Sequence, residues 1–100
     1  MVMAGEIDPV LTLRVALDPP SAGVSTSAGS EFDAAGFKVD SVSPRGLLIA
    51  GTRSLMEQFF STRIDFRERI PQFNREPTFD RLPGGVSYRA YFPREPTYFP

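Results

Sequence analysis

The sequence predicts a single α+β domain, and three stretches of it support that prediction. Apolar and polar residues alternate from Leu11 to Leu17. The stretch from Gly36 to Ser61 has the pattern of a strand, a tight turn, a second strand and an amphipathic helix, and more strand-like sequence follows it. The resulting order, β-α-β-β-α-β, is that of the ferredoxin-like split β-α-β fold with an antiparallel sheet.

The first strand and the first helix are expected in the opening third of the chain. In the strand at 11–17 every second residue is apolar, with Arg14 on the opposite face, as in a half-buried strand. Asp18 and the two prolines after it end the strand. The stretch that follows is rich in Ser, Ala and Gly, and its helix propensity is poor because Gly23 and Gly29 interrupt it. We therefore expect a short helix over Ser27–Ala35, closed by Gly36.

A hairpin and a second helix should follow. Apolar and polar side chains alternate over residues 37–41, and residues 44–46 (Pro-Arg-Gly) predict a tight turn. Residues 47–49 are bulky apolar residues, which favour a second strand. Thr52 can cap the next helix, and Ser54 opens an alternative capping box. An apolar stripe at helical spacing indicates a helix face packed on the sheet, and it comprises Leu55, Met56, Phe59 and Phe60.

The last third has a different composition. Ile64–Phe66 is expected to form the fourth strand of the sheet. Beyond it, proline removes backbone donors, so residues 67–100 should form an extended arm rather than regular structure. The segment from Phe59 onward holds 10 of the 12 aromatic residues, so the arm should pack on this domain or on a partner. We thus predict one domain over 1–100, with a core at 11–66 and an arm at 67–100.

Composition excludes several kinds of chemistry. The chain has no Cys and no His, which removes thiolate nucleophiles, the commonest general base and the commonest transition-metal ligand. No phosphate-binding loop or calcium loop is present, so we expect no enzyme activity and no cofactor or metal. No apolar run is long enough to span a bilayer, and no signal peptide is evident. These features predict a cytoplasmic protein, alone or within a larger assembly.

Three stretches resemble a known family, the pro-domains of sedolisin-type serine-carboxyl peptidases, also called pro-kumamolisin activation domains. They are GFKVDSVSPRGLLIAGT, the helix end FFSTRID, and GGVSYRAYFPREPTYFP. The resemblance covers residues 11–100. It departs from the family at Ser61, where a glycine is usual, in a weak first helix, and in an insertion at 67–83. The sequence has no peptidase domain, so no catalytic residue is carried over.

The resemblance implies a free-standing, non-catalytic module that binds a partner peptidase and inhibits it or assists its folding. The sheet would pack on the peptidase, and the C-terminal strand would lie in the substrate cleft, where main-chain hydrogen bonds and side-chain pockets hold it. Prolines would pre-extend that strand and lower the ordering cost of binding. The predicted partner-binding residues are Tyr88, Tyr91, Phe92, Arg94, Tyr98 and Phe99.

Two other functions remain open. A compact domain with an arm of alternating aromatic and Arg residues also suits a structural or assembly subunit of a particle or filament, since these residue types are enriched at interfaces. In that case copies of the chain would associate. Nucleic-acid binding is the less favoured alternative, because the strand at residues 46–51 has no aromatic or basic residue and the net charge is −1. The same charge gives no reason to expect binding to an anionic membrane.

Overall fold

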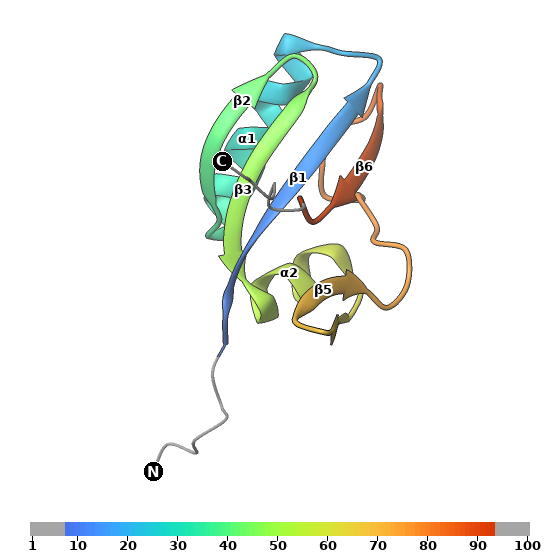
Figure 1. Ribbon diagram of the computed structural model, residues 1–100. Helices are drawn as coiled ribbons and strands as arrows, with labels where there is room; N and C mark the ends of the chain where they lie inside the picture. Colours follow the sequence, from blue (N-terminus) through green and yellow to red (C-terminus); the bar gives the residue numbers. More distant parts are fainter. Residues whose placement is uncertain (1–7, 94–100) are drawn as a thin grey trace, which may run out of the picture.

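The computed structural model describes residues 8–93, and within them the chain forms two helices and six strands (Figure 1). The strands make an antiparallel four-stranded sheet, with the order β2-β3-β1-β6, and a separate two-stranded hairpin, β4-β5. An α+β fold is therefore confirmed. The elements are β1 (Val10–Asp18), α1 (Ala22–Ala35), β2 (Lys38–Ser43), β3 (Gly46–Thr52), α2 (Arg53–Phe60), β4 (Ile64–Arg67), β5 (Ile70–Phe73) and β6 (Ser87–Tyr91).

Strand β1 lies inside the sheet and has the alternation that its sequence predicts. Leu13 and Val15 are fully buried, whereas Arg14 between them is exposed. On one side β1 pairs with β3, placing Leu13 opposite Ile49, and on the other with β6. Because side chains point alternately to the two faces of a strand, this register gives the sheet one apolar face and one polar face.

The β2-β3 hairpin also forms where the sequence predicts it. Its strands are joined at Pro44 and Arg45, with Ser43 opposite Gly46. A bulge interrupts the pairing between Val39 and Ser41. The turn therefore fixes the register of β3, whose buried residues then face the same way as those of β1.

Helix α1 is longer than predicted, because it begins at Ala22 rather than at Ser27. The side chain of Ser21 accepts a hydrogen bond from the backbone N–H of Val24 at 3.2 Å and so caps the helix. The helix packs a face of small residues against the sheet, where a Cβ on Gly29 would lie only 3.4 Å from Leu47. Tertiary packing thus outweighs the poor propensity of the sequence. Gly36 closes the helix with φ 111°, as predicted.

Helix α2 begins at the predicted cap. The hydroxyl of Thr52 accepts from the backbone N–H of Leu55 at 3.2 Å, so Thr52 rather than Ser54 is the cap. The carboxylate of Glu57 accepts instead from the N–H of Ile64 at 2.8 Å, just beyond the end of the helix. The predicted apolar stripe packs into the core, and its buried members are Met56, Phe59 and Phe60.

The prediction that Ile64–Phe66 forms the fourth strand of the sheet is wrong. Residues 64–67 form β4, which pairs with β5 in the separate hairpin. The reason lies in Glu68 and Arg69, which adopt positive φ of 51° and 71°, the signs required by a type I′ turn. This turn folds the chain back before it can reach β1. The fourth strand is β6, which lies within the segment predicted to be an extended arm.

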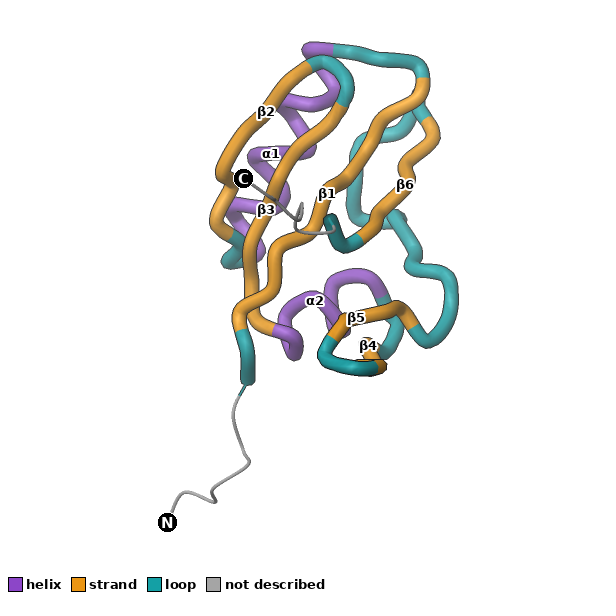
Figure 2. The backbone as a smooth tube through the Cα atoms, viewed as in Figure 1, coloured by secondary structure: helices purple, strands orange, loops and turns teal. Residues whose placement is uncertain are grey.

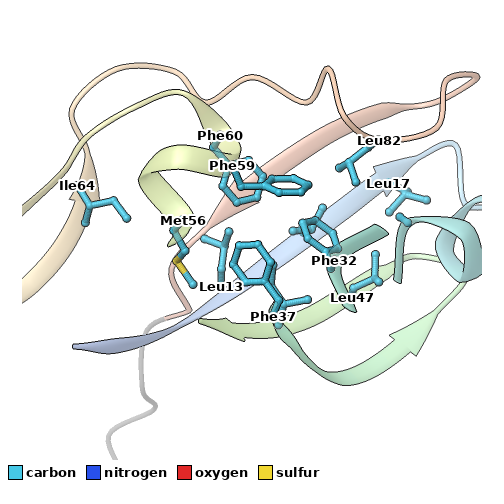
Figure 3. Close-up of a cluster of buried hydrophobic side chains, with 13 residues drawn as sticks. Leu13, Leu17, Phe32, Phe37, Leu47, Met56, Phe59, Phe60, Ile64 and Leu82 are labelled. Atoms are coloured by element: carbon cyan, nitrogen blue, oxygen red, sulfur yellow. The ribbon is translucent and has the colours of Figure 1, made fainter. Parts of the chain in front are cut away.

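Aromatic side chains dominate the core between the sheet and the helices (Figure 3). Phe32 of α1 lies 5.0 Å from Phe59 of α2 and 5.4 Å from Phe37, measured between ring centroids. Phe60 is also fully buried. Leu82, from the long segment before β6, is 8% exposed and packs on the same cluster. Residues beyond β4 therefore complete the core.

Candidate partner-binding surface

The two faces of the four-stranded sheet are covered unequally. Figure 2 shows α1 lying behind β2 and β3, with no helix or strand of residues 8–93 in front of them. We call the uncovered side the open face. Its central residues belong to β1, β3 and β6, and they are Thr12, Arg14, Ala16, Leu48, Ala50, Arg89 and Tyr91.

The strand register arranges these residues in rows across the open face. Arg14 lies opposite Leu48 on one side and opposite Tyr91 on the other. In the next row, Ala16 lies between Gly46 and Arg89. Cross-strand neighbours on one face have Cβ atoms only about 4.5–5.5 Å apart, so each row is a continuous surface.

The open face carries cationic groups that have no acidic partner among the described residues. Among residues 8–93 the ion pairs are Lys38 with Asp40 at 3.7 Å and the half-buried pair of Arg53 with Glu57 at 3.3 Å within α2. No carboxylate of these residues therefore lies within 4.0 Å of the guanidinium groups of Arg14, Arg45 or Arg89. The surface thus offers half-buried aliphatic area next to hydrogen-bond donors that the described protein does not use.

Two of the predicted partner-binding residues face the core. Tyr88 is half-buried, its ring stacks on Phe79 at 5.5 Å between centroids, and its hydroxyl donates to the carbonyl of Pro83. Burial raises the pKa of the Tyr88 phenol above its usual value. Phe92 is also half-buried, with its ring centroid 4.8 Å from that of Phe73. Both side chains contribute to the packing of the fold itself.

Tyr91 has the opposite orientation, because it lies three positions after Tyr88 along β6 and side chains alternate between the two faces of a strand. It lies on the open face beside Arg14 and is 43% exposed. The remaining predicted residues, Arg94, Tyr98 and Phe99, lie outside the described residues. The structure therefore places one of the six predicted side chains on an exposed surface and two against the core. A role in partner binding stays a prediction for all six.

Sequence reasoning missed the residues that surround Tyr91 on the open face. Arg14, Arg45, Leu48 and Arg89 come from three strands and a turn, and no local motif connects them. The signal that could have found them is the alternation of β1, which already places Arg14 opposite the buried leucines. What the sequence does not give is the neighbour of β1, because β6 is 69 residues away from it in the chain.

The surface has other features besides the open face. The β4-β5 hairpin exposes Phe66 and Ile70, whose exposed fractions are 40% and 45%. The guanidinium carbon of Arg53 lies 5.4 Å from the centroid of the Phe66 ring. A shallow groove of about 520 Å³ lies between α1 and β2, next to Gly29 and Val42. Within residues 8–93 no three His, Cys, Asp or Glu side chains are grouped as metal ligands. No helix in this part of the chain has the length and apolar character needed to cross a membrane.

Comparison with protein-family models, with curated proteins and with solved structures found no match for this chain.

Proposed function

We propose that this chain is a non-catalytic protein–protein interaction module that binds its partner through the open face. The observation behind the proposal is the unequal covering of the sheet. Both helices pack on one side, while the other side combines half-buried Leu48, exposed Tyr91 and arginines that form no ion pair with a carboxylate of residues 8–93. Aromatic and Arg side chains around an aliphatic centre are the composition of interface cores.

The finer proposal is a ferredoxin-like arrangement with pro-domain-like activity towards a peptidase. Strands β1 and β2 both run antiparallel to β3, lie on either side of it, and are joined through α1. Strands β3 and β6 have the same relation to β1, joined through α2 and the hairpin. Two interleaved β-α-β units of this kind define the ferredoxin-like order. In this interpretation β4-β5 is an insertion.

The edge strand β6 supports peptidase binding in particular. Within the described part of the chain it pairs with β1 on one side only, so its other side would offer backbone groups to a partner strand. The segment after β6, with prolines at 93, 96 and 100, would continue into the peptidase cleft as an extended strand. The partner would be inhibited, or its folding assisted, by contacts of both the sheet and this strand.

Inhibition of a mature sedolisin-type peptidase by the purified chain tests this function. Leu48→Asp should weaken inhibition by at least about tenfold, because it places an unpaired charge at the centre of the interface. Ile70→Asp, an equivalent change at an exposed aliphatic residue of the hairpin, is the matched control and should leave inhibition unchanged. Full inhibition by a chain that lacks residues 91–100 would overturn the role of the C-terminal strand, and no inhibition at all would overturn the peptidase partner.

An assembly subunit is the second candidate, favoured by the exposure of Phe66 and Ile70 on the projecting hairpin. Light scattering after size-exclusion chromatography separates the two functions. A discrete oligomer or filament that Ile70→Asp dissociates would favour assembly, whereas a monomer that inhibits the peptidase would exclude it.

A further inference from the structure

A small cavity opens on the open face where three segments of the chain meet. Arg14 of β1, Arg45 of the β2-β3 turn and Tyr91 of β6 line it, together with Ala16 and Gly46. Its volume is about 160 Å³. Two arginines and a tyrosine that are far apart in the sequence thus line one hollow.

The hollow exists because its floor is made of the two smallest residue types. Ala16 and Gly46 are direct cross-strand partners, so they lie next to each other on the open face. A Cβ added at Gly46 would collide with the backbone carbonyl oxygen of Val15. Glycine is therefore required at this position for the β1-β3 pairing, and the floor of the hollow stays open as a consequence.

Two of the residues that line the cavity, Arg14 and Arg45, carry cationic side chains. Ser43 also lines it, but its hydroxyl already accepts from the N–H of Arg45 at 3.3 Å and donates to the carbonyl of Gly46 at 3.4 Å. Neither arginine has a carboxylate of residues 8–93 within 4.0 Å. Arginine binds planar oxyanions through two parallel hydrogen bonds, so this arrangement is complementary to a carboxylate.

We propose that this cavity binds the carboxylate of a glutamate or aspartate side chain presented by the partner protein. The inference rests on the proposed function in one respect, namely that a partner protein presents the carboxylate. The preference for a carboxylate as the ligand rests on the residues of the cavity. At about 160 Å³ the hollow is smaller than the ~300–1,000 Å³ typical of sites for whole small molecules, so it suits one side-chain head group. Leu48, in the same row as Arg14, gives the neighbouring aliphatic surface on which the partner backbone would rest.

The charge of the molecule favours a protein carboxylate over a polyanion. The chain as a whole has a net charge of −1, and Asp18 and Asp40 lie on the strands that form this sheet. Binding of nucleic acid depends on neutralising many phosphates at once, for which an extended basic surface is needed. A single carboxylate needs only the two arginines at the cavity.

Nuclear magnetic resonance titration of the full, isotope-labelled chain at low salt tests the cavity directly. The ligand is N-acetyl-glutamate N-methylamide, and its neutral glutamine analogue is the control compound. We expect saturable shifts of the Arg14 and Arg45 side-chain N–H signals with the glutamate compound only, with a dissociation constant in the millimolar range. Arg14→Gln and Arg45→Gln should each weaken binding by about tenfold or more, since each removes a charge-assisted hydrogen bond.

Arg89→Gln is the matched control, because Arg89 lies on the same face of β6 but does not line the cavity. It should change the affinity by less than about twofold. Equal weakening by Arg89→Gln and Arg14→Gln, or shifts that do not saturate, would overturn a defined site. Inorganic phosphate that binds at least tenfold more tightly than the glutamate compound would overturn the carboxylate assignment.

Two further results separate this inference from the proposed function. If the glutamate compound binds to the Glu95→Gln variant but not to the unmodified chain, then the chain supplies its own carboxylate to the cavity. This result would overturn the proposal that a partner protein supplies it. If Arg14→Gln and Arg45→Gln inhibit the peptidase as well as the unmodified chain does, the cavity assignment fails while the function stands. If the cavity binds the compound but no peptidase is inhibited, the peptidase partner fails and the carboxylate chemistry stands.

Discussion

The two faces of the four-stranded sheet are built from the same strands but have opposite roles. On the inner face Leu13, Val15 and Ile49 are fully buried beneath two helices. On the open face, residues adjacent to these in sequence, Arg14 and Leu48, remain accessible to solvent. The difference shows that a period of two residues is enough to separate the surface that stabilises the fold from the surface available for binding.

The comparison predicts that substitutions on the two faces affect different measurements. The largest expected effect is that of Phe60→Ala, since this fully buried ring lies 4.9 Å from Phe59 and 5.8 Å from Phe79. Removing it should cost about 3–5 kcal/mol through lost burial and a residual cavity. For a domain with a total stability of about 5–15 kcal/mol, this is a large fraction.

Urea denaturation measures this loss, and Leu48→Ala on the open face is its control. The control should lower the free energy of unfolding by about 1 kcal/mol or less, because Leu48 is only half-buried. Similar losses in the two variants would mean that the open face is as tightly packed as the core, which would contradict the distinction between the faces.

A second prediction concerns the added volume that the inner face tolerates. In Gly51→Ala the new Cβ would lie 2.5 Å and 2.8 Å from two carbons of the Phe37 ring, so the ring must move within the core. Overpacking of this kind costs about 1–3 kcal/mol. Gly84→Ala is the matched control, because nothing lies within 4 Å of its Cβ position. A loss in thermal stability for Gly51→Ala alone is the expected result.

The elements that form the inner face could be predicted from the sequence more accurately than the order of the strands in the sheet. The alternation of β1, the β2-β3 turn and the Thr52 cap are local signals, and each lies where the sequence places it. The start of α1 was missed because small residues allow close packing on the sheet, a property that helix propensity does not include.

The order of the strands could not be predicted, because it depends on a turn without the usual residues. Type I′ turns favour Asn and Gly, whereas this chain uses Glu68 and Arg69. Pro71 also argued against a strand in this region, although β5 forms there. A prediction that places residues 64–66 in the four-stranded sheet leaves residues 87–91 in the arm, so it does not bring together the residues around Tyr91.

A third prediction compares two tyrosines of β6 on opposite faces. Tyr88 faces the core and has a raised pKa because of burial. A group whose pKa is raised on folding keeps its full contribution to stability below its unfolded pKa and loses it as pH rises through the folded value. The free energy of unfolding should therefore fall above about pH 10, and this fall should be smaller in Tyr88→Phe.

At neutral pH, Tyr88→Phe should cost about 0.5–1.5 kcal/mol, because the hydrogen bond to the carbonyl of Pro83 is lost. Tyr91→Phe, which changes the open face, is the control and should leave the free energy of unfolding at neutral pH unchanged. Denaturation curves at neutral and alkaline pH measure the loss at neutral pH and the alkaline fall in Tyr88→Phe. An alkaline profile that is the same in Tyr88→Phe and the unmodified chain would show that Tyr88 is not the group responsible.

The smallest expected effect on stability belongs to the cavity on the open face. Arg14→Gln combined with Arg45→Gln should change the free energy of unfolding by no more than about 0.5 kcal/mol, since neither guanidinium has a carboxylate partner among residues 8–93. The measurement is urea denaturation at low and at high salt. A slight gain at low salt is expected, because two like charges beside one cavity repel each other and salt screens that repulsion.

A loss larger than about 1 kcal/mol would mean that these arginines stabilise the fold, and would remove the reason for assigning them to a partner. The expected result, no loss of stability together with weaker binding of a carboxylate, is the opposite of what Phe60→Ala should show. Two arginines that line one cavity, one from β1 and one from the β2-β3 turn, yet add no stability to the fold, are then explained by what they bind.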